Sequence, residues 1–294
     1  MRLVTFRTDD QATHAGVVHD NRILALPYAT LLEALRSPNL QAEAAHASGS
    51  AYALDEVKWL TPIPEPPTMR DFFAFEQHVK AARARKGMDM IPLWYEIPTF
   101  YFTNTSELYG PGDAVPYPEG CQELDFELEI ACVIGREGKD ITVEEAADYI
   151  AGYMIMNDWS ARDFQREDML LTLGPGKGKD FATSLGPWLV TPDELAAYRS
   201  GSGAGERYNM TMLARINGKE VSRGNFKDIF YSFPQIIARA SRNTRLRVGD
   251  VIGSGTVGTG CILELGTEVH RWLQRGDTVE LEIEGIGALR NTIV

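Results

Sequence analysis

The chain has 294 residues and a mass of 32.6 kDa, and its 41 acidic and 29 basic side chains give a formal net charge of −12. Hydrophobic residues make up 44% and charged residues 24%, which is ordinary for a globular protein and excludes disordered, collagenous and low-complexity chains. The acidic balance argues against nucleic acid and against anionic membrane surfaces as partners, because both require a concentrated basic face.

The cysteines and the apolar stretches indicate the cellular setting. Cys121, Cys132 and Cys261 are too few and too scattered for a disulfide framework, and they form no C-x-x-C zinc motif. The first ten residues carry no long apolar run, and no stretch of about 18 apolar residues occurs, so we expect neither a signal peptide nor a membrane span. We therefore expect a soluble, cytoplasmic protein with reduced thiols.

A proline-rich stretch divides the chain. Residues 1–60 contain short β-type runs at 3–6, 16–19 and 22–26, and Leu31, Leu32 and Leu35 then follow a helical spacing. Four prolines within residues 61–67 remove amide donors and favour an extended linker. We predict a small β-rich domain over residues 1–60 and a second domain over residues 61–294.

The second domain has a mainly β pattern, so the fold class is α+β. Asn217-Gly218 between two apolar runs predicts a type I′ hairpin. Helices are predicted over residues 142–151, where Thr142 and Glu145 have capping-box spacing, and over residues 226–240. The G-x-G-x-x-G letters at 253–258 are followed by a β-type run at 259–265, which argues against a dinucleotide-binding motif.

Residues 123–134, ELDFELEIACVI, form the most informative segment. Apolar residues alternate strictly, which predicts a strand with one buried face. The opposite face carries Asp125, Glu127 and Glu129, whose side chains start roughly 6.6 Å apart along a strand. This face is either solvated or a ligand pair for a hard cation such as Mg²⁺, Mn²⁺ or Ca²⁺.

Two further positions are candidates for chemistry. Asp158 follows an apolar run at the start of a polar segment and is either a third metal ligand or part of a helix start. Among the five histidines, only His78 lies in a segment rich in aromatic and acidic residues. It is a candidate general base, although a histidine on its own is more often structural.

Taken together, the segments resemble the fumarylacetoacetate hydrolase family from about residue 60 to the C-terminus. The resemblance depends on E-L-E at 127–129, M-N-D-W-S-A-R-D at 156–163 and G-K-D-F-A-T at 178–183, in that order. It implies a mixed β-sandwich roll with a small N-terminal β-rich domain, a divalent cation (Mg²⁺ or Mn²⁺, with Ca²⁺ as an alternative) on carboxylates, and a homodimer.

The resemblance also implies roles residue by residue. Its metal-site residues correspond here to Asp71, Glu127, Glu129, Asp158 and Thr183. Its substrate-binding residues correspond to Tyr101, Arg162, Gln165 and Thr256. His78 corresponds to the general base, Glu264 to its orienting partner, and Lys179 to a positive charge near a developing oxyanion.

These roles predict hydrolysis of a C–C bond in a small β-diketo acid that is acylpyruvate-like or fumarylacetoacetate-like. A His–Glu pair activates water, and the cation stabilises the enolate leaving group. The alternatives are oxaloacetate decarboxylation, isomerisation or hydration of a 2-oxo-alkenedioate at the same metal site, and a non-enzymatic metal-binding role.

The chain departs from the founding enzyme of the family around the expected pocket. Only residues 257–262 separate the S-G-T and L-E-L segments, where that enzyme has a Pro/Glu-rich insertion. Residues 79–87 are typical of a basic amphipathic helix, which is either a lid or a solvated helix, and residues 88–98 shape a pocket or an interface. These departures leave the substrate's side chain open.

Overall fold

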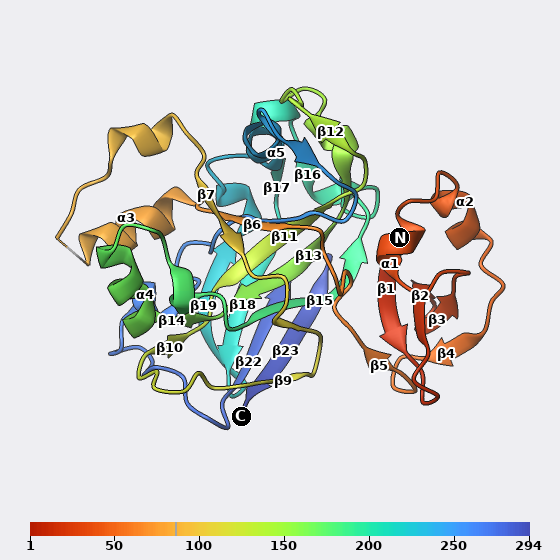
Figure 1. Cartoon of the computed structure of the whole chain (residues 1–294), viewed down its shortest axis with the longest axis horizontal. Coiled ribbons are helices and arrows are strands. Elements are labelled where there is room, and N and C mark those ends of the chain that lie inside the picture. Colours follow the sequence, from red (N-terminus) through yellow and green to blue (C-terminus); the bar gives the residue numbers. More distant parts are fainter. Residues whose placement is uncertain (86) are drawn as a thin grey trace.

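A computed structural model describes residues 1–85 and 87–294. Figure 1 shows a large β-rich body with a smaller unit beside it, formed by the N-terminal residues. Strands account for more of the chain than helices, which confirms the α+β, mainly β fold. Within the described residues, no helix is long and apolar enough to cross a membrane.

The N-terminal unit is a small antiparallel arrangement around β1. Its elements are β1 (Arg2–Arg7), β2 (Thr13–His19), β3 (Arg22–Ala25), α1 (Leu31–Ala34), α2 (Leu40–Ala45), β4 (Ala51–Ala53) and β5 (Lys58–Trp59). β1 pairs with β2 and β5 inside the unit. Its first residues, Arg2 and Leu3, also pair with Val190 and Leu189 of the main body, so the sheet runs on from one unit into the other.

The main sheet follows the order β4-β3-β2-β1-β15-β13-β11-β21-β6-β7. Its strands in the large body are β6 (Met69–Phe72), β7 (Phe100–Thr103), β8 (Leu108–Tyr109), β11 (Leu128–Ile134), β13 (Ile150–Asp158), β15 (Thr183–Val190) and β21 (Val251–Gly253). Every residue of β11 is buried. The sheet is therefore covered on both faces here.

A second sheet packs against the main one. It has the order β19-β18-β22-β23-β9 and consists of β9 (Ala114–Val115), β18 (Thr211–Ile216), β19 (Lys219–Asn225), β22 (Thr278–Ile283) and β23 (Gly287–Ile293). One apolar cluster joins Ile155 of the main sheet to Met212 and Leu281 of the second. The predicted hairpin is confirmed: Asn217 and Gly218 join β18 to β19 with φ values of 52° and 80°.

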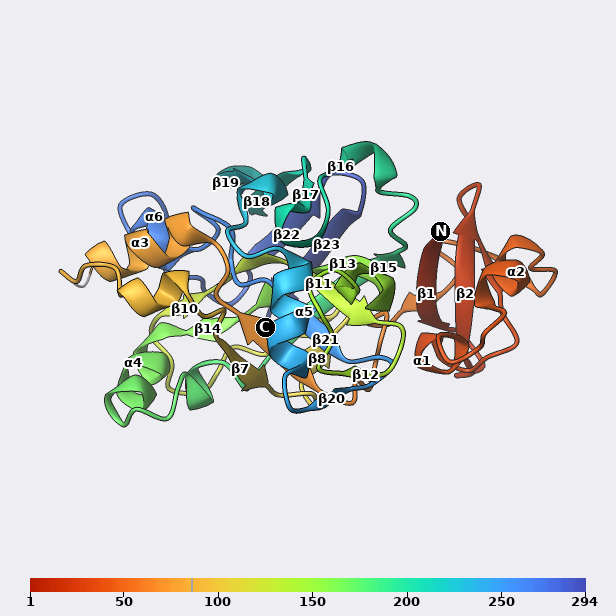
Figure 2. The ribbon, with the colours of Figure 1, turned by 90° about the horizontal axis from the view of Figure 1, so that it is seen from above.

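The large body also contains α-helices. They are α3 (Glu76–Ala84), α4 (Arg162–Leu170), α5 (Phe233–Ser241) and α6 (Ile262–Leu265). Short strands complete the body: β10 (Leu124–Asp125), β12 (Gly138–Lys139), β14 (Ser160–Ala161), β16 (Arg199–Ser200), β17 (Arg207–Tyr208) and β20 (Arg245–Leu246). Figure 2 shows α3, α4 and α6 gathered at the end of the body remote from the N-terminal unit.

Two predicted helices are shorter than expected. Thr142 and Glu145 form the predicted capping contacts, but only a 3₁₀ turn follows at Ala146–Tyr149, because Ile150 already begins the buried strand β13. The segment from residue 226 starts with a 3₁₀ turn, Phe226–Asp228. The helix α5 begins only after Ser232, which forms a capping box with Gln235.

Burial on β11 generates a test of the fold. Ile130 is fully buried between the sheets, so we expect Ile130→Ala to lower the free energy of unfolding by about 2–5 kcal/mol through lost contacts and a residual cavity. Val269→Ala, at a side chain that is 49% exposed, is the matched control and should leave stability nearly unchanged. Chemical denaturation measures both, and equal midpoints would contradict the packing described for β11.

Candidate active site

Four carboxylates converge at one end of the main sheet. Asp71 lies on β6, Glu129 on β11 and Asp158 at the end of β13, while Glu127 directly precedes β11. One oxygen from each side chain lies within 4.8 Å of the others, and all four residues are buried. Antiparallel β11 and β13 place Glu129 opposite Met156, which brings the start of one strand beside the end of the other.

This burial corrects one prediction for residues 123–134. The segment is broken into β10 and β11, and Asp125, Glu127 and Glu129 are at most 6% exposed, so the solvated-face prediction is wrong. β10 pairs with β14, whereas β11 pairs with β13 and β21. Other elements therefore cover the carboxylate-bearing face, and its polar pattern reflects a buried site.

Several carboxylate oxygens in the cluster lack a donor. Both oxygens of Glu129 and Oδ1 of Asp158 are buried and have no hydrogen-bond partner among the described residues. Buried carboxylates without partners are costly, so protons or a cation must offset their mutual repulsion. The donor set consists of oxygen alone, which suits Mg²⁺, Mn²⁺ or Ca²⁺. Asp71, Glu127, Glu129 and Asp158 thus fit the divalent cation that the sequence predicts.

The cluster also shifts the acidity of its members. Burial, reinforced by the charge of Asp158, raises the pKa of Asp71 to about 7. Burial and the neighbouring charge of Asp71 raise the pKa of Glu129 well above its ordinary value, and burial raises that of Asp158. In the metal-free protein, the cluster therefore retains protons near neutral pH.

Two cations share Glu127. Lys179 Nζ lies 2.7 Å from Glu127 Oε2 and 2.6 Å from Asp158 Oδ2, and Arg162 Nη2 lies 2.8 Å from Glu127 Oε1. Burial opposes the charge of Glu127, but Lys179 and Arg162 outweigh it and hold the pKa of Glu127 well below its usual range. Burial likewise opposes the charge of Lys179, yet Asp158 and Glu127 raise its pKa. Glu127 is therefore ionised and Lys179 cationic at neutral pH.

A histidine–glutamate pair lies beside the cluster. His78 of α3 and Glu264 of α6 are both buried, with Nδ1 and Oε2 separated by 2.9 Å. The other oxygen of Glu264 accepts a hydrogen bond from the Thr259 amide at 2.7 Å. With Nδ1–H directed at Glu264, the Nε2 atom of His78 is the ring nitrogen that can accept a proton.

Asp125 holds the start of α6, the helix that carries Glu264, a role that the sequence analysis missed. It accepts hydrogen bonds from the amides of Ile262 and Leu263, at 2.7 and 3.0 Å, and from Arg162 Nε at 2.9 Å. Residues 262–265 form the one-turn helix α6, so the prediction of a β-run over 259–265 is wrong there. The buried carboxylate stabilises the start of this turn. The sequence signal that could have indicated this role is the position of Asp125 in the alternating segment E-L-D-F-E-L-E at residues 123–129.

A cavity of about 370 Å³ brings most of the predicted residues together, although Glu129, Asp158 and Glu264 are not part of its wall. Its wall includes eight of them: Asp71, His78, Tyr101, Glu127, Arg162, Gln165, Lys179 and Thr256. The wall also contains residues without a role predicted from the sequence: Phe72, Phe73, Thr99, Phe100, Met169 and Pro175, together with Gly255 and Leu263 of the S-G-T and L-E-L segments and Ala82 of the segment expected to be a lid or a solvated helix. The cavity thus combines carboxylates, cations and a histidine with a largely apolar surround.

The predicted substrate-binding residues Tyr101, Gln165 and Thr256 each form a hydrogen bond with a neighbouring residue of the site. The Tyr101 hydroxyl donates to Asp158, Gln165 accepts from Arg162 Nη1 at 3.0 Å, and the Thr256 hydroxyl donates to the Leu128 carbonyl at 3.2 Å. Thr183 pairs with Asp158 across β13 and β15 and lies outside the cavity wall.

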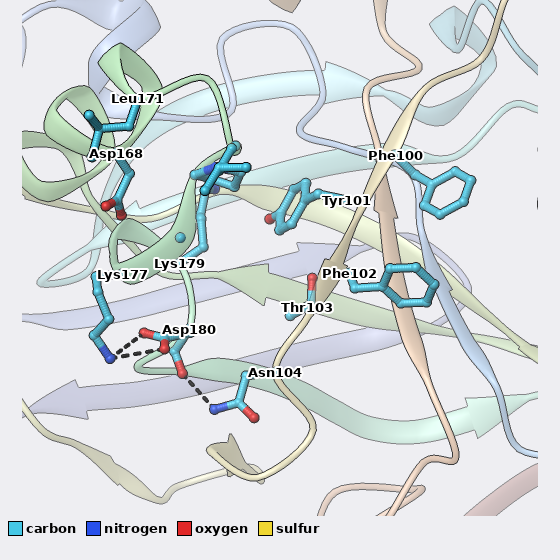
Figure 3. Close-up of a pocket in the computed structure, with 14 residues that line it drawn as sticks. Phe100, Tyr101, Phe102, Thr103, Asn104, Asp168, Leu171, Lys177, Lys179 and Asp180 are labelled. Atoms are coloured by element: carbon cyan, nitrogen blue, oxygen red, sulfur yellow. Dashed lines mark hydrogen bonds and ion pairs between the residues drawn. The ribbon is translucent and has the colours of Figure 1, made fainter.

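Figure 3 shows a larger pocket that adjoins this cavity. In that view the side chains of Tyr101 and Lys179 point toward one another. The pocket has a volume of about 880 Å³ and shares Phe100, Tyr101, Pro175 and Lys179 with the cavity.

Comparison with models of known protein families identifies the family to which the chain belongs. The model of the fumarylacetoacetate (FAA) hydrolase C-terminal region matches residues 68–294, directly after the proline-rich stretch. The chain belongs to the fumarylacetoacetate hydrolase family. This confirms the resemblance drawn from the sequence.

Relatives in the family carry different activities in their names. Oxaloacetate tautomerase fahd2 of Xenopus laevis is 34% identical over 67% of this chain and 58% of its own length. Oxaloacetate tautomerase YisK of Bacillus subtilis is 32% identical over 82% and 75%, and the fumarylacetoacetase of Oryza sativa is 31% identical over 65% and 56%. The chain thus spans less than two thirds of the frog and rice relatives.

Solved structures share the whole fold. The fumarylacetoacetate hydrolase of Exiguobacterium antarcticum superposes with a TM-score of 0.79 at 26% identity, over 100% of this chain and 99% of the other. The 5-carboxymethyl-2-hydroxymuconate delta-isomerase of Mycobacterium smegmatis gives 0.76 and 26%, with the same coverage. One fold therefore accompanies both a hydrolase and an isomerase.

The buried carboxylates generate a pH prediction. Because the pKa of Asp71 rises from 3.8 to about 7 on folding, the folded state binds a proton more tightly than the unfolded state. The contribution of Asp71 to stability is present at low pH and is lost as pH rises between about 4 and 7. We expect the unfolding temperature of chelator-treated protein to fall over this range, and Mn²⁺ at pH 8 to raise it again. A metal-free unfolding temperature that Mn²⁺ leaves unchanged would contradict the site.

Replacing one carboxylate of the cluster by a neutral amide should distinguish its effect on the stability of the metal-free protein from its role as a metal ligand. An amide at this position is neutral without taking up a proton, whereas wild-type Glu129 must bind one on folding at pH 8, so we expect Glu129→Gln to have a higher unfolding temperature than wild type in chelator at pH 8, and a smaller rise on adding Mn²⁺. Glu119→Gln, at an exposed glutamate, is the control and should match wild type in both measurements. A Glu129→Gln protein with the full Mn²⁺ response would exclude Glu129 as a ligand.

Proposed function

We propose that this chain is a metal-dependent hydrolase that cleaves a C–C bond in a β-diketo acid of the acylpyruvate or fumarylacetoacetate kind. The proposal depends on one observation: His78, held by Glu264 at 2.9 Å, lines the same cavity as Asp71, Glu127 and Lys179. A base that is already oriented beside a cation-binding cluster is what water attack on a chelating substrate requires.

The dyad would activate water. His78 Nε2 accepts a proton from a water molecule while the Glu264 carboxylate fixes the tautomer and stabilises the imidazolium. The hydroxyl group adds to the distal carbonyl carbon, and the bond between this carbon and the methylene carbon breaks. The electron pair remains on the methylene carbon, which takes the proton from His78. The products are a carboxylic acid and a methyl ketone, and the ketone is a 2-oxo acid when the substrate is an acylpyruvate.

The polar residues around the dyad would hold the anionic substrate. Asp71, Glu127, Glu129 and Asp158 would hold a divalent cation, which when bound supplies a Lewis acid for the substrate's oxygens. Lys179 lines the cavity as a cation and can stabilise negative charge that develops on an oxygen. Arg162 and Lys179 also neutralise Glu127, which keeps anionic substrate from meeting an uncompensated carboxylate.

A second candidate is proton transfer without water attack, as in tautomerisation or isomerisation of a 2-oxo acid. It is favoured by relatives named oxaloacetate tautomerase, two of them at 34% and 32% identity, and by the structural similarity to a muconate isomerase. Oxaloacetate decarboxylation would use the same cation and needs no activated water. The reactions differ in their products and so can be separated directly.

Product analysis by NMR distinguishes the reactions. The purified protein is mixed with acetylpyruvate or with oxaloacetate, each with Mn²⁺ and each after chelation. We expect acetate and pyruvate from acetylpyruvate with Mn²⁺ and neither after chelation. Rapid metal-dependent keto–enol exchange of oxaloacetate, with no acetate formed from acetylpyruvate, would favour the tautomerase. Pyruvate formed from oxaloacetate but not from acetylpyruvate would indicate a decarboxylase.

Substitution of the dyad tests its role. We expect His78→Ala to lower kcat for acetylpyruvate hydrolysis by roughly 10²–10⁴-fold, because the proton acceptor for water is lost. The unfolding temperature in Mn²⁺ should keep its full response, since His78 is not a ligand of the oxygen cluster. His19→Ala, at a side chain that is 72% exposed, is the control and should keep the wild-type rate. Full hydrolysis by the His78→Ala protein would reject the mechanism.

A further inference from the structure

The proposed mechanism gives no role to the buried cysteine beside His78. Cys261 is fully buried, and its Sγ lies 4.0 Å from His78 Nδ1 on the side of the ring that faces Glu264. One potential ligand atom from each of His78, Cys261 and Glu264 lies within 4.8 Å of the other two. Nitrogen, sulfur and carboxylate oxygen therefore converge at a point separate from the four-carboxylate cluster.

Two of the three spacings among these atoms are close to those of a zinc site. Zinc bonds of about 2.3 Å to sulfur and about 2.0–2.2 Å to nitrogen and oxygen set the edges of a tetrahedron at roughly 3.3–3.6 Å. Here the His78–Glu264 distance is 2.9 Å and the Cys261–His78 distance is 4.0 Å. Shifts of roughly half an ångström, one opening and one closing, would bring these two distances to tetrahedral edges, and the ligand atoms of the third pair, Cys261 and Glu264, lie within 4.8 Å of each other.

The charges also favour zinc at this point. A thiolate and a carboxylate together neutralise Zn²⁺, which suits a buried position, and the imidazole binds as a neutral ligand. The fourth position of the tetrahedron would be left to water, as in zinc sites with three protein ligands. The thiolate selects zinc over Mg²⁺, whereas the oxygen-only cluster is suited to hard cations.

We propose that His78, Cys261 and Glu264 form a second, inhibitory metal site that takes Zn²⁺ or a similar thiophilic cation. Binding at Nδ1 replaces the hydrogen bond to Glu264 and moves the ring proton from Nδ1 to Nε2, while the thiol releases its proton to solvent. His78 Nε2 then carries hydrogen and cannot accept a proton from water. Zinc would thus remove the general base while leaving the catalytic cation in place. The inhibition, although not the binding, depends on the proposed function.

Cobalt spectroscopy tests the binding without any assay of turnover. The full-length protein is first saturated with Mg²⁺ and then titrated with Co²⁺, because Co²⁺ on a thiolate gives a charge-transfer absorption that oxygen ligands do not give. We expect this band in wild type and its loss in both Cys261→Ser and Cys261→Ala. Cys121→Ser is the matched control, since Cys121 is buried beside Asp163 with a sulfur–oxygen distance of 3.3 Å. A band that survives in both Cys261 variants, or none in wild type, would reject the site.

Inhibition by Zn²⁺ tests the consequence. Hydrolysis is measured with Mg²⁺ in excess, and each protein is compared with its own rate without Zn²⁺. We expect the Zn²⁺ concentration for half-inhibition to be roughly tenfold or more higher in Cys261→Ser and Cys261→Ala than in wild type, because the thiolate ligand is lost. Cys121→Ser should match wild type. Equal Zn²⁺ sensitivity in all four proteins would overturn the proposed mode of inhibition. A cobalt band in a protein without hydrolase activity would instead uphold the metal site and reject the proposed function.

Discussion

Electrostatic repulsion among four buried carboxylates is the constraint around which the site is arranged. Asp71, Glu127, Glu129 and Asp158 come from three strands and a connecting residue, and the sheet brings their oxygens within 4.8 Å. Such a grouping is stable only with protons, cations or both. Lys179 and Arg162 offset part of the charge from one side, while both oxygens of Glu129 and one oxygen of Asp158 have no hydrogen-bond partner among the described residues.

The fold separates two kinds of chemistry within a short distance. The cluster presents oxygen alone and is anchored in strands whose residues are buried on both faces. The His78–Glu264 pair is held by two helices, and Asp125 bonds the start of α6 as well as Arg162. Asp125 thus connects the proton-transferring pair with the cation that neutralises Glu127. The position of the base and the charge of the metal site are coupled through this one carboxylate.

Much of this site could be predicted from local sequence. The alternating carboxylates at 127 and 129, the acid at 158 and the histidine at 78 were recognisable as candidate groups, and the family resemblance connected them. The mainly β class and the Asn217-Gly218 hairpin also follow from short-range patterns.

The parts that sequence did not predict depend on distant partners. The break after Asp125 arises because β10 and β11 pair with different strands, and the α6 turn is stabilised by a carboxylate more than 130 residues earlier in the chain. The contact between Cys261 and His78 likewise joins two segments whose proximity only the tertiary fold creates. The helices expected at 142 and 226 end or begin elsewhere because packing into the sheets overrides local propensity.

The pairing of β1 with β15 has a consequence for folding during synthesis. β1 leaves the ribosome long before β15, yet Leu3 pairs with Leu189, a partner far downstream in the chain. β2 and β5 are synthesised much earlier than β15, so the N-terminal unit can assemble around β1 before Arg2 and Leu3 can pair with β15. The joint between the two units is therefore a late event, completed when β15 arrives with Thr183, the residue that lies opposite Asp158, at its other end.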